Sequence, residues 1–172
     1  KRDYEIADIR SIIMVEDNPR YYSIILPLLY RTALKHARNL ISKSLSDTDK
    51  LLLFRARPKI ILTSTYEEAI GFYDTYRNNI LGMVSDIRFP MNGEINQNAG
   101  LKLTEYIRSK DSDMPIVLQS TNSKYHKEAD RVNASFIHKE SDTLLQDLED
   151  FIVNNFGFGD FIFRDHNGKE IS

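Results

Sequence analysis

The sequence has no cysteine, little net charge and no long apolar run. Without cysteine, the chain has no disulfide scaffold, no thiolate metal site and no cysteine nucleophile, and its composition suits a reducing compartment. The longest apolar runs, such as residues 24–29, are far too short to span a membrane, and the first residues contain no apolar core of a signal peptide. We therefore expect a cytoplasmic chain without a membrane-spanning segment.

The apolar content is sufficient for one globular domain. Hydrophobic residues make up 41% of the 172 residues and charged residues 28%, as in folded chains and unlike disordered ones. The formal net charge of −2 excludes a chain that coats nucleic acid along its whole length.

Charge is distributed unevenly along the chain. Residues 30–59 carry eight Lys or Arg against two Asp, a net charge of +6, whereas residues 140–172 carry eight acids against two basic residues, a net charge of −6. The basic stretch could face a phosphate backbone or an acidic partner. Few aromatic residues interleave with these charges, so a solvated helix face is the favoured interpretation, and we expect no nucleic-acid binding through this domain.

Short apolar runs alternate with helical patterns along the chain. The apolar runs cover residues 12–15, 59–63, 80–85, 115–119 and 134–138. Apolar residues at helical spacing cover residues 24–41, 66–76, 101–107 and 144–152, and residues 122–132 form a more polar helix candidate. Parallel strands need helical crossovers between them, so this alternation predicts an α/β fold with a parallel five-stranded sheet covered on both faces.

Two details of the first crossover remain open in the sequence. Pro27 either kinks the first helix, which follows Asn18-Pro19, or marks its later true start. Ser46-Asp47 is expected to begin a further short helix that runs through Leu53. Together these features predict an enlarged first crossover.

Polar residues follow the predicted strands at their carboxyl ends, where ligands bind in sheets of this kind. These residues are Glu16 and Asp17, Asp86, Ser120 with Thr121, and Lys139. Clustered carboxylates repel one another unless a cation joins them, and oxygen ligands suit Mg²⁺. A carboxylate can also act as a nucleophile toward phosphorus, while a metal ion, a lysine and a hydroxyl stabilise the phosphoryl oxygens. The set therefore predicts phosphoryl-transfer chemistry.

At these residues the chain resembles the receiver domain of response regulators, the CheY-like phospho-accepting half of two-component signalling. The matching stretches are residues 15–18, 85–90, 115–120 and 134–139. The resemblance covers roughly residues 10–156. It implies a flavodoxin-like (βα)5 fold, doubly wound, with strand order 2-1-3-4-5.

The resemblance also implies a role for each matching acid. Asp86 would accept the phosphoryl group from a phosphohistidine. Glu16 and Asp17 would hold Mg²⁺ together with Asp86, helped by the backbone carbonyl of Arg88. Such a domain has at most self-phosphorylation and self-dephosphorylation activity of its own.

The remaining matches concern the phosphoryl oxygens and the switch. Ser120 would bond a phosphoryl oxygen and pull its loop inward, and Lys139 would pair with the phosphate. Phe136 takes the position of the switch aromatic, and Thr121 stands beside Ser120 where a small residue is common.

Several positions depart from the family pattern. Residues 91–99 add a short insertion after the acceptor loop, and Arg88 could reach over the site. Glu140 replaces the proline that often follows the lysine, so a cis bond is not expected there. None of these departures removes a reacting atom.

Each candidate also has an ordinary structural interpretation. Asp86 could be a loop acid or helix cap, and Glu16-Asp17 a solvated turn. Lys139 could be a surface lysine, and Ser120 or Thr121 could cap the next helix.

The resemblance extends to domains and partners. Residues 1–156 would form the receiver domain, and residues 157–172 a β-hairpin with a turn at Asn167-Gly168, or the start of a linker to a further domain. The implied partners are a sensor histidine kinase or phosphotransfer protein, an effector domain in the same chain, and a second copy in a homodimer. The alternative is a pseudo-receiver, a phosphorylation-independent protein-interaction module, such as the regulatory N-terminal part of a larger phosphotransferase.

Overall fold

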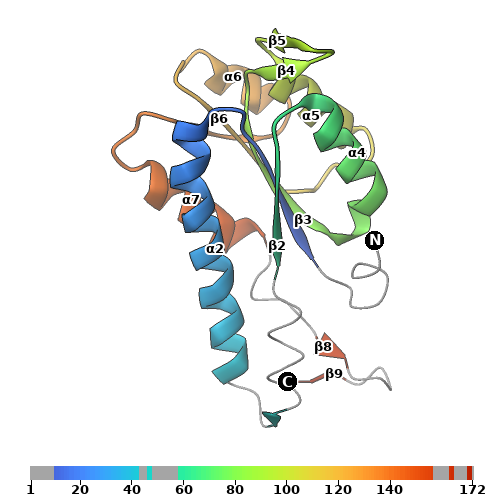
Figure 1. Ribbon diagram of the computed structural model, residues 1–172, viewed down its shortest axis with the longest axis vertical. Helices are drawn as coiled ribbons and strands as arrows, with labels where there is room; N and C mark the ends of the chain where they lie inside the picture. Colours follow the sequence, from blue (N-terminus) through green and yellow to red (C-terminus); the bar gives the residue numbers. More distant parts are fainter. Residues whose placement is uncertain (1–9, 43–45, 48–57, 157–162, 165–169, 172) are drawn as a thin grey trace.

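A parallel sheet of five strands forms the centre of the molecule (Figure 1). The structure, a computed structural model, describes residues 10–42, 46–47, 58–156, 163–164 and 170–171. The strands of this sheet are β1 (Ser11–Val15), β2 (Lys59–Thr63), β3 (Ile80–Asp86), β6 (Ile116–Ser120) and β7 (Ser135–His138). Their spatial order is β2-β1-β3-β6-β7, which confirms the predicted order 2-1-3-4-5.

Helices cover both faces of this sheet. They are α2 (Pro19–Ser42), α4 (Tyr66–Tyr76), α5 (Ala99–Arg108), α6 (Tyr125–Arg131) and α7 (Leu144–Asn155), with a 3₁₀ turn, η1 (Arg77–Asn79), after α4. The buried apolar residues fall into two clusters, one beneath α2 and α7 and the other beneath α4, α5 and α6. Figure 1 shows α2 and α7 on one side of the sheet and α4 and α5 on the other. Among the described residues, no helix is long and apolar enough to cross a membrane.

Strand β1 shows why the sequence folds this way. All five of its residues are buried, and their side chains alternate between the two clusters. Ile13 and Val15 pack beneath α4 and α5, whereas Ile12 and Met14 pack beneath α2 and α7. A continuous apolar run is therefore the pattern of a central strand covered on both faces.

The first helix begins directly after the first pair of acids. Asn18 precedes it, and its side-chain oxygen accepts a hydrogen bond from the backbone N–H of Arg20 at 3.0 Å. Pro19 takes the first helical position, where a proline loses no intrahelical bond. The later start at Pro27 was wrong, because Pro27 lies inside α2.

A small hairpin follows β3. It overlaps the insertion that the sequence predicts at residues 91–99. Strands β4 (Phe89–Met91) and β5 (Glu94–Asn96) pair in antiparallel fashion. Asn92 and Gly93 between them have φ values of +56° and +81°. Positive φ at both central residues is the condition for a type I′ turn, one of the two common two-residue hairpin turns, and Asn-Gly is its preferred sequence.

The first crossover and the carboxyl-terminal segment are described only in part. In the first crossover, Asp47 is helical, but most of the short helix expected through Leu53 lies outside the described residues. At the carboxyl end, β8 (Phe163–Arg164) and β9 (Glu170–Ile171) pair in antiparallel fashion, as the hairpin prediction requires. Its expected turn at Asn167-Gly168 lies outside the described residues.

Candidate functional site

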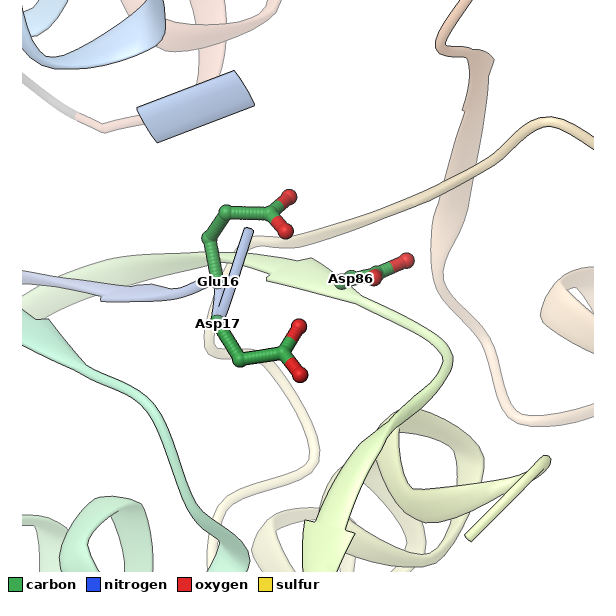
Figure 2. Close-up of side chains that lie close together, drawn as sticks. All are labelled: Glu16, Asp17 and Asp86. Atoms are coloured by element: carbon green, nitrogen blue, oxygen red, sulfur yellow. The ribbon is translucent and has the colours of Figure 1, made fainter. Parts of the chain in front are cut away.

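Three carboxylates lie together at the carboxyl end of the sheet. Glu16 and Asp17 follow β1, and Asp86 ends the neighbouring strand β3. One oxygen from each lies within 4.8 Å of one from each of the others. Figure 2 shows the side chains of Glu16 and Asp17 extending toward the side on which Asp86 lies. The strand pairing of β1 with β3 therefore brings together residues that α2, β2 and α4 separate along the chain.

Lys139 places its ammonium group between two of these carboxylates. Its Nζ lies 2.5 Å from Oε2 of Glu16 and 2.9 Å from Oδ2 of Asp86. The side chain is only 3% exposed, so the surface-lysine interpretation was wrong. The backbone N–H of Lys139 donates to the carbonyl of Ser120 at 2.9 Å, which fixes the residue at the end of β7 beside β6.

Burial raises the pKa of two of these carboxyl groups, Asp86 and Glu16. Removal from water raises the pKa of Asp86 above its ordinary value, and the attraction and hydrogen bond of Lys139 oppose that rise without cancelling it. Burial likewise raises the pKa of Glu16, the charge of Asp86 adds to the rise, and Lys139 again opposes it. The site therefore holds two desolvated carboxyl groups around one cation. This arrangement costs folding free energy, and such groups occur most often at functional sites.

Backbone groups hold the Asp86 carboxylate in place. The N–H of Ile87 donates to Oδ1 of Asp86 at 2.7 Å, and the nearby backbone N–H of Arg88 also favours the ionised form and so lowers the pKa of Asp86. Gly100, at the start of α5, packs directly on this turn, and a Cβ at that position would lie 2.3 Å from the carbonyl oxygen of Asp86. Asp86 is thus a fixed group of the site and not a free loop acid.

Ser120 ends β6 and Thr121 follows it, on the side of β3 away from β1. Ser120 is buried, and its Oγ accepts a hydrogen bond from the backbone N–H of Asn122 at 3.2 Å. Helix α6 begins only at Tyr125, and its N-cap residue, Lys124, makes no side-chain cap bond. The interpretation of Ser120 or Thr121 as the cap of α6 was therefore wrong.

A cleft of about 640 Å³ opens over these groups. Besides Asp17, Asp86, Ser120, Thr121 and Lys139, it is lined by the side chains of Arg88, Tyr21, Ile95, Gln97 and Lys124, among others. A hydrogen bond joins the residue after β5 to α6, because the hydroxyl of Tyr125 donates to the carbonyl of Gln97 at 3.0 Å. Both residues line the cleft. The cleft thus combines carboxylates with cationic side chains around its opening.

The predicted switch aromatic lies apart from this cleft. Phe136 is half-buried on β7 and does not line the cleft. Its ring meets that of His126 on α6 edge-on, with centroids 5.6 Å apart. Among the described residues there is no cis peptide bond, as expected at Glu140.

Sequence reasoning missed two contributors to the site. Tyr21 in the first turn of α2 places its ring centroid 4.2 Å from Nζ of Lys139. The β4–β5 hairpin contributes Ile95 to the cleft wall. Asn92-Gly93 was a readable signal for the hairpin. Nothing in the sequence pointed to Tyr21, because its partner lies at the other end of the chain.

The fold of this chain is similar to solved structures, although its sequence matches no known family model. No protein-family model and no curated protein sequence matches the chain. A response regulator receiver domain protein from Clostridium thermocellum matches in structure, with a TM-score of 0.60 and 14% identity over 87% of this chain and 95% of that chain. The fold is that of a response-regulator receiver domain.

Two further receiver structures give the same result. The non-phosphorylated HemR receiver domain from Leptospira biflexa has a TM-score of 0.57 and 20% identity, over 91% of this chain and 98% of that chain. The response regulator TrrA from Thermotoga maritima, in complex with Mg²⁺ and BeF, has a TM-score of 0.55 and 17% identity, over 83% of this chain and 99% of that chain. The receiver fold thus extends over most of the chain.

The residues of this receiver fold suit a divalent cation. Three carboxylates within 4.8 Å of one another offer only oxygen ligands, the donor type that Mg²⁺ prefers. Lys139 already places a positive charge against two of them, so the arrangement is one that cations stabilise. The donor chemistry of the three carboxylates therefore fits a divalent cation.

Proposed function

We propose that this chain is a cytoplasmic, Mg²⁺-dependent receiver domain that accepts a phosphoryl group on Asp86. The observation that carries the proposal is the buried Lys139 ammonium, which contacts the Asp86 carboxylate at 2.9 Å at the carboxyl edge of the sheet. A carboxylate nucleophile beside a fixed cation, with a hydroxyl of Ser120 on the same cleft, is the equipment that phosphoryl transfer needs.

In the proposed reaction, a carboxylate oxygen of Asp86 attacks the phosphorus of a phosphohistidine. A new O–P bond forms while the P–N bond breaks, and the departing imidazole keeps the electron pair of that bond. Lys139 balances charge on the phosphoryl oxygens, and the Ser120 hydroxyl donates a hydrogen bond to one of them. The hydrogen bond from the N–H of Ile87 keeps the attacking carboxylate oriented.

Glu16, Asp17 and Asp86, with the backbone carbonyl of Arg88, would hold the metal ion. When bound, Mg²⁺ neutralises charge on the transferring phosphoryl group. Asp17 is only partly buried and lines the cleft, so it is open to such a ligand.

The readout would follow the usual receiver pattern. Ser120, with Thr121 beside it, would move toward the phosphoryl group, and Phe136 would change its packing on α6 and β7. A sensor histidine kinase or phosphotransfer protein would supply the phosphoryl group. Residues 1–156 would form the receiver, and an effector domain or a second copy of the chain would sense the change.

The second candidate is a pseudo-receiver that binds partners without phosphorylation. The contact between Glu16 and Lys139 favours it, because a buried ion pair can satisfy the site without metal or phosphate. The two candidates predict opposite results in one experiment.

That experiment is incubation with Mg²⁺ and acetyl phosphate, followed by intact-mass measurement. We expect wild type to gain the mass of one phosphoryl group, and Asp86→Asn to gain none. Asp113→Asn is the matched control, because Asp113 is an exposed aspartate that precedes β6, at the opposite edge of the sheet. If wild type gains nothing, or if Asp86→Asn gains as much as wild type, the phospho-acceptor proposal fails.

A further inference from the structure

The ammonium group of Lys139 has a third neighbour besides its two carboxylates. Tyr21 lies in the first turn of α2, half-buried against the core beneath that helix. The centroid of its ring is 4.2 Å from Nζ of Lys139. A cation within about 6 Å of an aromatic centroid is attracted by the negative face of the ring.

These three neighbours surround one ammonium group. Glu16 Oε2 accepts a hydrogen bond from Nζ at 2.5 Å, Asp86 Oδ2 forms an ion pair with it at 2.9 Å, and the Tyr21 ring centroid lies 4.2 Å away. The side chain of Lys139 is 3% exposed, so little water is available to replace any of them. The attraction between cation and ring is stronger in such a dry position than at the surface.

Tyr21 attracts a second cation as well. The guanidinium carbon of Arg20, the preceding residue, lies 5.7 Å from the same ring centroid. The separation is longer than that of Lys139, and Arg20 is exposed, so its contact is the weaker of the two. The ring therefore serves mainly the buried lysine.

We propose that Tyr21 is a positioning residue for phosphoryl transfer, whose ring face holds the Lys139 ammonium against Asp86. The inference rests on the proposed function. A carboxylate that ligates a divalent cation can no longer give all its charge to a lysine, so Glu16 cannot serve both partners fully. The ring is uncharged and ligates no metal, so it would keep Lys139 beside Asp86 if Glu16 ligated the metal ion.

The first test is a spectroscopic one on the metal-free protein. Protons held over the face of an aromatic ring resonate upfield, so the ε-methylene signals of Lys139 should lie upfield of those of exposed lysines. We expect Tyr21→Phe to keep this shift and Tyr21→Leu to abolish it. Loss of the signals in Lys139→Arg assigns them. An unchanged shift in Tyr21→Leu would overturn the inference.

The second test measures rate constants of phosphorylation by acetyl phosphate with Mg²⁺. We expect Tyr21→Leu to slow the reaction by about threefold to thirtyfold, the range for loss of a cation–π contact, and Tyr21→Phe to stay within about twofold of wild type. Tyr22→Leu is the matched control, because Tyr22 is also half-buried against the same core cluster. Tyr21→Met provides a second variant without an aromatic face, because its unbranched side chain fills the space by adapting its shape.

The outcomes separate the two proposals. If wild type accepts a phosphoryl group and the Leu and Met variants react at the wild-type rate, the inference is overturned and the proposed function stands. If Tyr22→Leu slows the reaction as much as Tyr21→Leu, the effect is one of core packing and the inference is also overturned. If wild type accepts no phosphoryl group, the proposed function itself fails.

Discussion

The charged groups of Glu16, Asp86 and Lys139 are held largely out of water, which costs free energy. Two carboxyl groups out of water have their pKa raised, because one ammonium cannot fully replace lost hydration. The raised pKa also means that the metal-free protein needs a higher pH than an exposed aspartate does to hold Asp86 as the carboxylate that attacks phosphorus.

Asp86→Asn should therefore stabilise the metal-free protein in a pH-dependent way. With its pKa raised, folded Asp86 binds a proton more tightly than the unfolded residue does, so its contribution to stability is lost as pH rises through the folded pKa. The amide does not ionise. Between about pH 4 and about pH 7, the free energy of unfolding of Asp86→Asn should therefore rise relative to that of wild type.

Urea denaturation at both pH values, with divalent metal removed, measures this difference. The exposed variant Asp113→Asn should show no comparable gain, since surface substitutions change stability little. A variant Asp86→Asn that is less stable than wild type at neutral pH would mean that the pairing with Lys139 outweighs the cost of burial.

At the scale of elements, the turn after β3 is tightly packed on the start of α5. The N–H of Gly100 donates to the carbonyl of Ile87 at 2.9 Å. A Cβ on Gly100 would lie 2.3 Å from the carbonyl oxygen of Asp86 and 2.9 Å from Cα of Ile87. Backbone atoms cannot yield as a flexible side chain can, so only glycine fits this contact.

Gly100→Ala should consequently destabilise the protein by about 1–3 kcal/mol, as overpacking does. Gly71→Ala is the matched control. Gly71 lies inside α4 with nothing within 4 Å of the added Cβ, so this change should stabilise by roughly 0.5–1 kcal/mol. Midpoints of urea denaturation compare the two variants. Equal effects of the two substitutions would contradict the close approach of α5 to Asp86.

The sequence was a good guide to most elements and a poor guide to one. The apolar runs predicted all five strands of the main sheet, because strands covered on both faces are apolar throughout. The β4–β5 hairpin carries only the short signal Asn92-Gly93, and its strands are three residues each. So short a pair has no periodicity of its own, and only the tertiary structure shows that it helps to line the cleft.

At the scale of the whole molecule, both core clusters of the described residues are complete by Phe156. That residue is 1% exposed and packs beneath α2 and α7. It also fills the space beside Gly82 of β3, where an added Cβ would come within 2.2 Å of its ring. The end of α7 is thereby joined to the centre of the sheet.

A chain of residues 1–156 should therefore fold alone. We expect its thermal midpoint to lie within about 3 °C of that of the full chain, because a loss of 1 kcal/mol would shift it by about 2–8 °C. Its gain of phosphoryl mass with acetyl phosphate should equal that of the full chain. A much lower midpoint would show that residues 157–172 belong to the receiver and would overturn the proposed domain boundary.

By itself, the sequence determined the fold class and the polar side chains at the strand ends. Apolar periodicity is local, and so is the position of Asp86 or Lys139 just after a strand, which makes both readable without a structure. Only the tertiary structure decided how these groups pair. The contact of Lys139 with Glu16 spans 123 residues, and Tyr21 meets the same ammonium from another element. Strand order and helix placement set such contacts, and burial then determines their energy, so no local pattern in the chain records them.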